Sequence, residues 1–209
     1  MNTSNKVPVA LTTHELRVLL SKAKEHDHRA FVLFLVTASH GLRVSEVINL
    51  KRRNFTEAAS GSYLTIQRLK GSLKTSQRLL PNADPLFDEQ TVVAEYIRNL
   101  KTDDYLFTNE KGKKLTRWGV TYLMQQYCRW AGIPEHKCHV HVLKHTCGVL
   151  LRQTGAKLEV IQQALGHKRL DSTAQYLRVT PEEADEARTA AFASAAAQAS
   201  NAAAAAMRL

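Results

Sequence analysis

At 209 residues, the chain is long enough for one substantial hydrophobic core or at most two small domains. Its hydrophobic fraction of 44% and its charged fraction of 23% are ordinary for a soluble globular protein. The longest apolar stretch, residues 30–38, is too short to cross a bilayer, and residues 1–15 lack the apolar core of a signal peptide. These features argue against a membrane partner and against export, and they favour a cytoplasmic protein.

The charge balance is basic. There are 29 Lys and Arg residues against 19 Asp and Glu residues, a formal net charge of +10. Such a balance favours a polyanionic partner, with nucleic acid as the leading candidate. The three cysteines form no C-x-x-C pair, which argues against a disulfide framework.

The first part of the chain is predicted to be helical after a loose tail at residues 1–10. Thr12 or Thr13 is the expected N-cap of a helix that runs toward His28. Residues 30–39 are apolar nearly all round and predict a buried helix. Gly41 is expected to break that helix, and residues 43–50 are expected to form another short one.

The middle of the chain changes period. Residues 63–68 alternate and are rich in β-branched residues, and residues 76–80 can return as a second strand after a turn at Gly71-Ser72. Further elements are expected in chain order: a helix over 88–100, a short strand over 105–107, a turn at 111–112, and helices at about 117–131, 141–154, 157–165, 171–178 and 182–206. The predicted fold class is mainly α with a small antiparallel β-sheet insert, in one domain over residues 11–180. Residues 181–209 form an alanine-rich helix or tail with few apolar anchors, which is equally compatible with subunit exchange and with a frayed end.

Several side chains could carry chemistry, although each has an ordinary structural interpretation. Arg43, in Gly-Leu-Arg-Val-Ser-Glu, could simply be a solvated residue paired with Glu46. Tyr176 alone would be a half-buried core aromatic. A metal site is one alternative for the histidine-rich segment, with the candidate ligands Cys138, His139, His141 and His145. That segment lacks the glutamate of an H-E-x-x-H motif, so no metal site is predicted.

The order of these motifs is more specific than any of them alone. G-L-R-x-S-E at residues 41–46, a lysine at a two-strand hairpin, H-x-L-K-H at 141–145, L-G-H at 165–167 and a tyrosine nine residues later follow one another. Together they resemble the catalytic domain of the tyrosine recombinase (phage integrase) family over roughly residues 10–180. In length the chain is similar to the short members of that family, the fimbrial phase-variation inverters. The N-terminal core-binding domain of larger integrases is not expected in this chain, which would be either a fragment of a longer protein or a short recombinase of the inverter type.

The resemblance implies a role for each motif residue. Tyr176 would attack a DNA phosphate and form a 3′-phosphotyrosyl intermediate, without a metal, ATP or any other cofactor. Arg43 would grip the phosphate, and Glu46 would position the cluster. His141 would contact the phosphate or accept the tyrosine proton, and His167 would donate to a non-bridging oxygen. The leaving oxygen would take its proton from a hairpin lysine, for which Lys70 is favoured and Lys74 is the alternative.

Lys144 departs from the family pattern, which usually has arginine at this position as a second clamp on the phosphate. Lysine keeps the charge but loses bidentate geometry. We expect an active enzyme, and we expect Lys144→Arg to leave the activity equal or to raise it. The competing hypothesis is a DNA-binding regulator on a recombinase scaffold, whose catalysis is weakened by Lys144.

The implied partner is double-stranded DNA, bound by a homotetramer whose subunits could be monomeric in solution, with accessory DNA-bending proteins left open. Three basic clusters are candidates for contacts with DNA phosphates. Their members are Lys51, Arg52, Arg53, Lys113, Lys114, Arg117, Lys168 and Arg169.

Overall fold

In the computed structural model, residues 8–68, 74–177, 185 and 188–194 are described. The chain divides into two units, residues 1–176 and residues 177–209. The predicted domain boundary at residue 180 lies outside the described residues. In the second unit, residues 188–194 are helical and exposed, while most of the predicted helix over 182–206 also lies outside the described residues.

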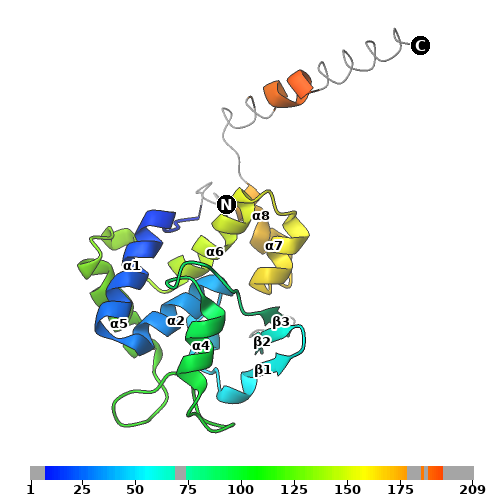
Figure 1. Cartoon of the computed structure of the whole chain (residues 1–209). Coiled ribbons are helices and arrows are strands. Elements are labelled where there is room, and N and C mark those ends of the chain that lie inside the picture. Colours follow the sequence, from blue (N-terminus) through cyan, green and yellow to red (C-terminus); the bar gives the residue numbers. More distant parts are fainter. Residues whose placement is uncertain (1–7, 69–73, 178–184, 186–187, 195–209) are drawn as a thin grey trace. The chain divides into compact units, whose positions relative to one another are not determined.

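The first unit is mostly helical, with a small sheet (Figure 1). Its α-helices are α1 (Thr13–His26), α2 (His28–Ser39), α3 (Val44–Val47), α4 (Glu89–Ile97), α5 (Arg117–Trp130), α6 (His141–Gln153), α7 (Leu158–Leu165) and α8 (Asp171–Ala174). Three 3-10 turns accompany them, η1 (Arg52–Asn54), η2 (Glu135–Lys137) and η3 (Gln175–Leu177). The sheet consists of β1 (Phe55–Ala58), β2 (Gly61–Ile66) and β3 (Thr75–Arg78), in the order β1-β2-β3 with antiparallel pairing throughout. The predicted fold class is therefore confirmed.

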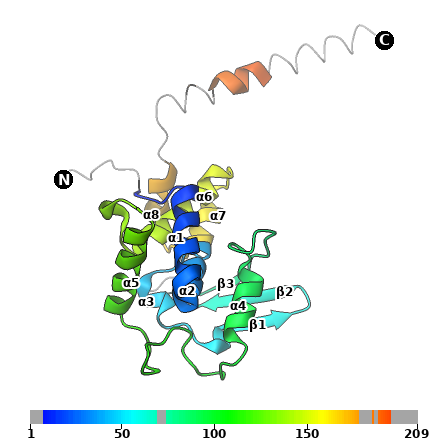
Figure 2. The same cartoon turned by 60° about the vertical axis from the view of Figure 1, so that its left-hand side comes forward.

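The core forms around α2, which is the most apolar helix of the unit. Residues 30–36 are buried, because this helix is packed against α1, α4 and α6. α1 begins with a capping box in which the Glu15 amide donates to Thr12 Oγ1 and the Thr12 amide donates to the Glu15 carboxylate. Figure 2 shows the sheet beside α4, on the side of the unit away from α5. None of the described helices is long and apolar enough to span a bilayer.

The predictions for the sheet region and for the short helix after Gly41 were wrong in detail. The strand expected at residues 105–107 is absent, and Tyr105 forms only an isolated bridge to Lys51. The strand β1 was not predicted, because Phe55 is its only buried residue and no alternating apolar pattern marks it. The helix expected over 43–50 is shorter, since α3 spans Val44–Val47 and Lys51 follows it in a bridge.

Candidate active site

Arg43 is held in place by a buried carboxylate. It is the N-cap of α3, and both its amide and its Nη1 donate to Glu46, each at 2.9 Å. The Arg43 side chain is 30% exposed, whereas Glu46 is buried. Burial acts to raise the pKa of Glu46, but the Arg43 amide and the Arg68 charge outweigh it and lower this pKa. Glu46 is therefore an ionised group that orients Arg43, leaving part of the guanidinium open to solvent.

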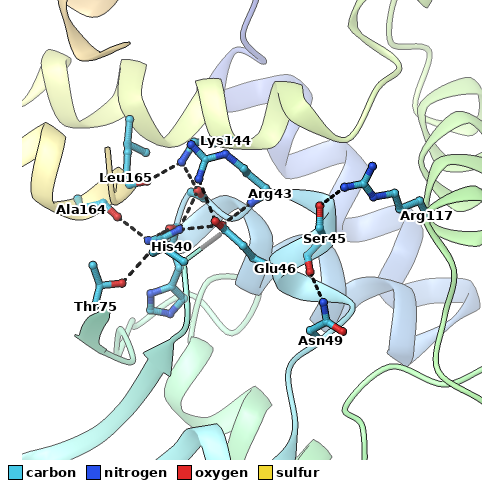
Figure 3. Close-up of polar contacts among 12 residues, drawn as sticks. His40, Arg43, Ser45, Glu46, Asn49, Thr75, Arg117, Lys144, Ala164 and Leu165 are labelled. Atoms are coloured by element: carbon cyan, nitrogen blue, oxygen red, sulfur yellow. Dashed lines mark hydrogen bonds and ion pairs between the residues drawn. The ribbon is translucent and has the colours of Figure 1, made fainter. Parts of the chain in front are cut away.

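Lys144 points into the protein and joins three segments (Figure 3). Lys144 is only 1% exposed to solvent. Its Nζ donates to the carbonyl oxygens of Gly41 and Leu165, each 2.7 Å away. Burial, followed by the charges of Arg68 and Arg43, lowers the pKa of Lys144 to about 7. Two of the three N–H donors of this ammonium thus connect α6 to the turn before Arg43 and to the end of α7.

His167 lies directly after the turn that ends α7. Gly166 adopts the left-handed conformation (φ +61°) that terminates this helix. The His167 ring is buried, and its Nδ1 lies 2.9 Å from Thr173 Oγ1. Burial and the nearby charges of Lys144 and Arg43 lower the pKa of His167 to about 3, so the ring is neutral.

Tyr176 is the last residue of the first unit, and its ring is buried against α6. A Cβ at Gly148 would lie 2.6 Å from two atoms of this ring, so the glycine provides the space that the ring occupies. The Tyr176 hydroxyl lies 2.9 Å from His145 Nδ1. Burial raises the pKa of Tyr176 despite the opposing charge of Arg43. In this arrangement the group is a neutral phenol.

His145 is the residue that the sequence interpretation missed. His141 was expected either to contact the phosphate or to accept the tyrosine proton; it is exposed at the start of α6, and His145 is the histidine that contacts the hydroxyl. The two imidazole centroids are 4.5 Å apart. Burial and then the neighbouring His141 lower the pKa of His145 to about 4, so its ring is neutral and able to accept a proton. The i, i+4 spacing of the two histidines was the available signal, since it places them on one helix face.

Of the two candidate lysines at the hairpin, the structure describes only Lys74. Lys70 lies outside the described residues. Lys74 is described, is exposed, and directly precedes β3, whose first residue Thr75 bonds the buried Arg68. The choice between the two lysines as proton donor therefore stays a prediction.

Part of the predicted basic surface gathers beside α3. Lys51 and Lys114 lie over the ring of Tyr105, with Nζ at 4.9 and 5.2 Å from its centroid. Lys114 Nζ also donates to Asn49, and Arg117 donates to Ser45 (Figure 3). Because Ser45 is on α3, this basic surface lies near Arg43.

The remaining basic candidates are placed differently. Arg53 pairs with Asp103 and Arg169 with Asp171, and Arg52 Nη1 donates to the Phe55 carbonyl. Lys113 and Lys168 are exposed.

Zinc binding was the alternative interpretation of the histidine-rich segment from Cys138 to His145. Within the described ranges, no group of three or more His, Cys, Asp or Glu residues could hold a metal ion. The thiol of Cys138 instead donates to the carbonyls of Ile133 and Pro134.

The arrangement as a whole provides groups for a phosphate ester. The three cationic or imidazole groups lie close together, because the charge of Arg43 lowers the pKa of both Lys144 and His167, and the charge of Lys144 lowers the pKa of His167. The Tyr176 phenol, in η3, is hydrogen-bonded to the neutral imidazole of His145, which follows Lys144 on α6. A guanidinium and an imidazole can bind non-bridging oxygens, and a phenol can attack phosphorus.

Comparison with known proteins gives consistent matches. A family model described as the phage integrase family matches residues 10–183. The tyrosine recombinase XerA of Pyrococcus furiosus is 33% identical over 188 residues, which cover 87% of this chain and 61% of XerA. The tyrosine recombinase XerC of Staphylococcus aureus is 28% identical over 186 residues, covering 85% and 59%. The chain thus spans about three fifths of the length of these curated relatives.

Solved structures show the same fold. A pre-cleavage complex of the XerH site-specific recombinase with its difH substrate matches with a TM-score of 0.72 and 25% identity, over 90% of this chain and 55% of that one. A lambda integrase dimer bound to a core site matches with a TM-score of 0.65 at 15% identity, over 83% and 49%.

Proposed function

Since the chain belongs to the phage integrase family, we propose that it is a tyrosine-type site-specific recombinase that breaks and rejoins DNA. The observation that carries the proposal is the hydrogen bond between the Tyr176 hydroxyl and the His145 imidazole, near the partly exposed Arg43. The relatives are tyrosine recombinases, and the XerH and lambda integrase structures contain DNA. These similarities support double-stranded DNA as the partner.

In the proposed reaction, the Tyr176 oxygen bonds to the scissile phosphorus and the bond from phosphorus to the 5′ oxygen breaks. The phenol proton passes to His145, and the hairpin lysine, Lys70 or Lys74, protonates the leaving oxygen. Arg43 and His167 stabilise charge on the non-bridging oxygens. Because one phosphate ester replaces another, the reversal needs no external energy source.

A covalent-capture experiment tests this function. A pool of nicked duplexes with randomised sequence around the nick is incubated with the protein and separated on a denaturing gel. We expect a DNA–protein adduct with the wild-type chain and none with Tyr176→Phe, which keeps the ring but lacks the nucleophile. A wild-type chain that shifts DNA on a native gel but never forms an adduct would contradict the proposal.

A DNA-binding regulator is the second candidate function, and Lys144 is the observation that favours it. Its ammonium is buried and already bonded to two backbone carbonyls, rather than open to a phosphate. A chain that binds but does not cleave would give the native-gel shift alone. The same capture experiment therefore separates the two functions.

We also propose that the protein acts as a homotetramer on two duplexes, with residues 181–209 exchanged between neighbouring subunits. The alanine-rich composition of this segment supports the proposal, because such a helix buries little area alone and needs a partner surface. Recombination of two duplexes requires four cleavages, which a tetramer supplies together. Whether such a reaction integrates, excises, inverts or resolves DNA would depend on the arrangement of the recombination sites.

A further inference from the structure

Arg68 is a fully buried cation that the proposed reaction does not use. It follows β2, and its side chain has no exposed area. Five acceptors surround its guanidinium: Thr75 Oγ1 at 3.2 Å, Glu46 Oε2 at 3.1 Å, and the carbonyls of Gly41, His40 and Ala164 at 3.3, 3.1 and 2.8 Å. A guanidinium has five N–H donors, so every donor has an acceptor and none remains for a substrate.

The segments that accept these bonds are the ones that carry the site residues. Gly41 is two residues before Arg43, and Glu46 holds the Arg43 side chain. Ala164 lies in the last turn of α7, three residues before His167. Figure 3 shows the labelled acceptors His40, Glu46, Thr75 and Ala164 approaching from separate segments. One side chain thus connects the segment of Arg43, the end of α7 and the hairpin.

Close packing reinforces these bonds. A Cβ at Gly166 would lie 2.5 Å from Arg68 Nε, so the turn before His167 rests directly on the guanidinium. A Cβ at Gly41 would lie 2.4 Å from Leu165 Cδ2, so the two turns also contact each other. Both glycines have positive φ angles. A shift of Arg68 would therefore move both turns.

Lysine could not replace this residue without loss. A planar guanidinium reaches acceptors in several directions at once, whereas an ammonium has three donors at one point. Breaking such a buried network leaves backbone carbonyls without their donors and removes the Arg68 bond to Glu46, so that Arg43 has to hold this carboxylate without Arg68. Glu46 would then be freer to leave its position under Arg43.

We propose that Arg68 is a positioning residue that fixes Arg43 and His167 relative to each other, so that both meet the same phosphate. It acts through Glu46 and through the Gly41 and Gly166 turns, without contacting DNA. This role rests on the proposed recombinase function and adds a residue to it. The family resemblance of the sequence motifs did not include this position.

The test compares Arg68→Lys with Arg98→Lys, an exposed arginine at the end of α4. Duplex binding is measured by fluorescence anisotropy, and the single-turnover rate of adduct formation is measured on the nicked duplex recovered from the capture pool. We expect Arg68→Lys to bind within about threefold of wild type but to form adduct roughly 100-fold more slowly, as small misalignments of catalytic groups do. Arg98→Lys should match wild type in both measurements.

A second substrate separates positioning from general loosening of the fold. A methylphosphonate at the scissile position removes the phosphate charge, so the alignment of Arg43 matters less. The rate difference between wild type and Arg68→Lys should shrink about tenfold on this substrate. An unchanged difference would overturn the proposed action through Arg43.

A milder variant covers the case in which Arg68→Lys does not fold. Thr75→Val removes only the acceptor of Arg68 Nε, and Thr65→Val, on the neighbouring strand, is its control. We expect Thr75→Val to slow adduct formation roughly threefold to tenfold, with Thr65→Val unchanged. If all variants form adduct at the wild-type rate, the positioning role of Arg68 is overturned, while the proposed recombinase function stands. Absence of adduct with the wild-type chain would overturn the proposed function and this role with it.

Discussion

Two helical glycines, Gly148 in the middle of α6 and Gly119 in the first turn of α5, provide a test of how Tyr176 is positioned. An alanine Cβ at Gly148 would lie 2.6 Å from Cε1 and Cζ of Tyr176, whereas an ordinary contact starts at 3.4 Å. The ring must therefore shift by about 0.8 Å, in a site where Tyr176 is 2% exposed. Such a shift disrupts the 2.9 Å contact between its hydroxyl and His145. We expect Gly148→Ala to slow adduct formation roughly 100-fold.

The effect of Gly148→Ala on stability combines two opposing terms. Alanine in a helix interior is favoured over glycine by about 0.5–1 kcal/mol, while overpacking of a full core costs about 1–3 kcal/mol. The net loss in the free energy of unfolding is therefore about 0–2.5 kcal/mol. Urea unfolding and the single-turnover adduct assay measure the two effects on the same preparation.

Gly119 in α5 is the matched control. A Cβ there would lie 3.6 Å from the side chains of Leu115 and Thr116, which is an ordinary contact. Gly119→Ala should therefore raise the free energy of unfolding by up to about 1 kcal/mol and leave the adduct rate unchanged. If Gly148→Ala gains the same stability and keeps the wild-type rate, the packing of Tyr176 against α6 is not as described.

Four further predictions concern charge, proton transfer and assembly. Burial lowers the pKa of Lys144 from 10.5 to about 7. Between these two pH values the unfolded chain binds more protons than the folded chain, so the destabilisation caused by burying this charged group decreases as the pH rises. Relative to Lys144→Met, the wild-type free energy of unfolding should rise by roughly 2–3 kcal/mol from pH 6 to pH 9 in urea titrations, and parallel pH profiles would contradict the lowered pKa. His145→Ala should slow adduct formation about 100-fold, and His136→Ala, at an exposed histidine, is the control. A wild-type rate for His145→Ala would indicate that His141, not His145, accepts the tyrosine proton. Arg117→Ala should lower the slope of log affinity against log salt by about one on a mixed-sequence duplex, and an unchanged slope would remove Arg117 from the DNA surface. Truncation after Thr180 should weaken assembly on DNA more than single-site cleavage in native and denaturing gels, and unchanged cooperativity would argue against subunit exchange.

The helical framework was predictable because its signals are local. The Thr12 cap with Glu15 and the apolar run of α2 each act within a few residues, and both agree with the structure. The strand expected around Tyr105 fails for the opposite reason, since its only pairing partner is Lys51, far away in sequence. No local pattern determines whether such a segment extends its pairing.

For the site, motif order predicted candidate residues but not their orientation. Lys144 was considered as a phosphate contact, yet its Nζ is directed to Gly41 and Leu165, which only the tertiary structure reveals. Arg68 had a usable signal. Leu64 and Ile66 alternate on one face of β2, Arg68 continues the same alternation just after the strand, and all three are buried. A charged residue in phase with two core residues indicates a buried, paired cation.

The contact of Lys144 with Gly41 also bears on the stage of folding at which the proposed active site is completed. The two residues are 103 positions apart, and the turns they connect have no local substitute. Contacts of such long sequence separation form only after the intervening chain has been ordered. During synthesis, Arg43 emerges well before α6, α7 and Tyr176, so a nascent or truncated chain holds the proposed phosphate-binding arginine without the proposed nucleophile. In a recombinase of this fold, cleavage would therefore become possible only in the last stage of folding.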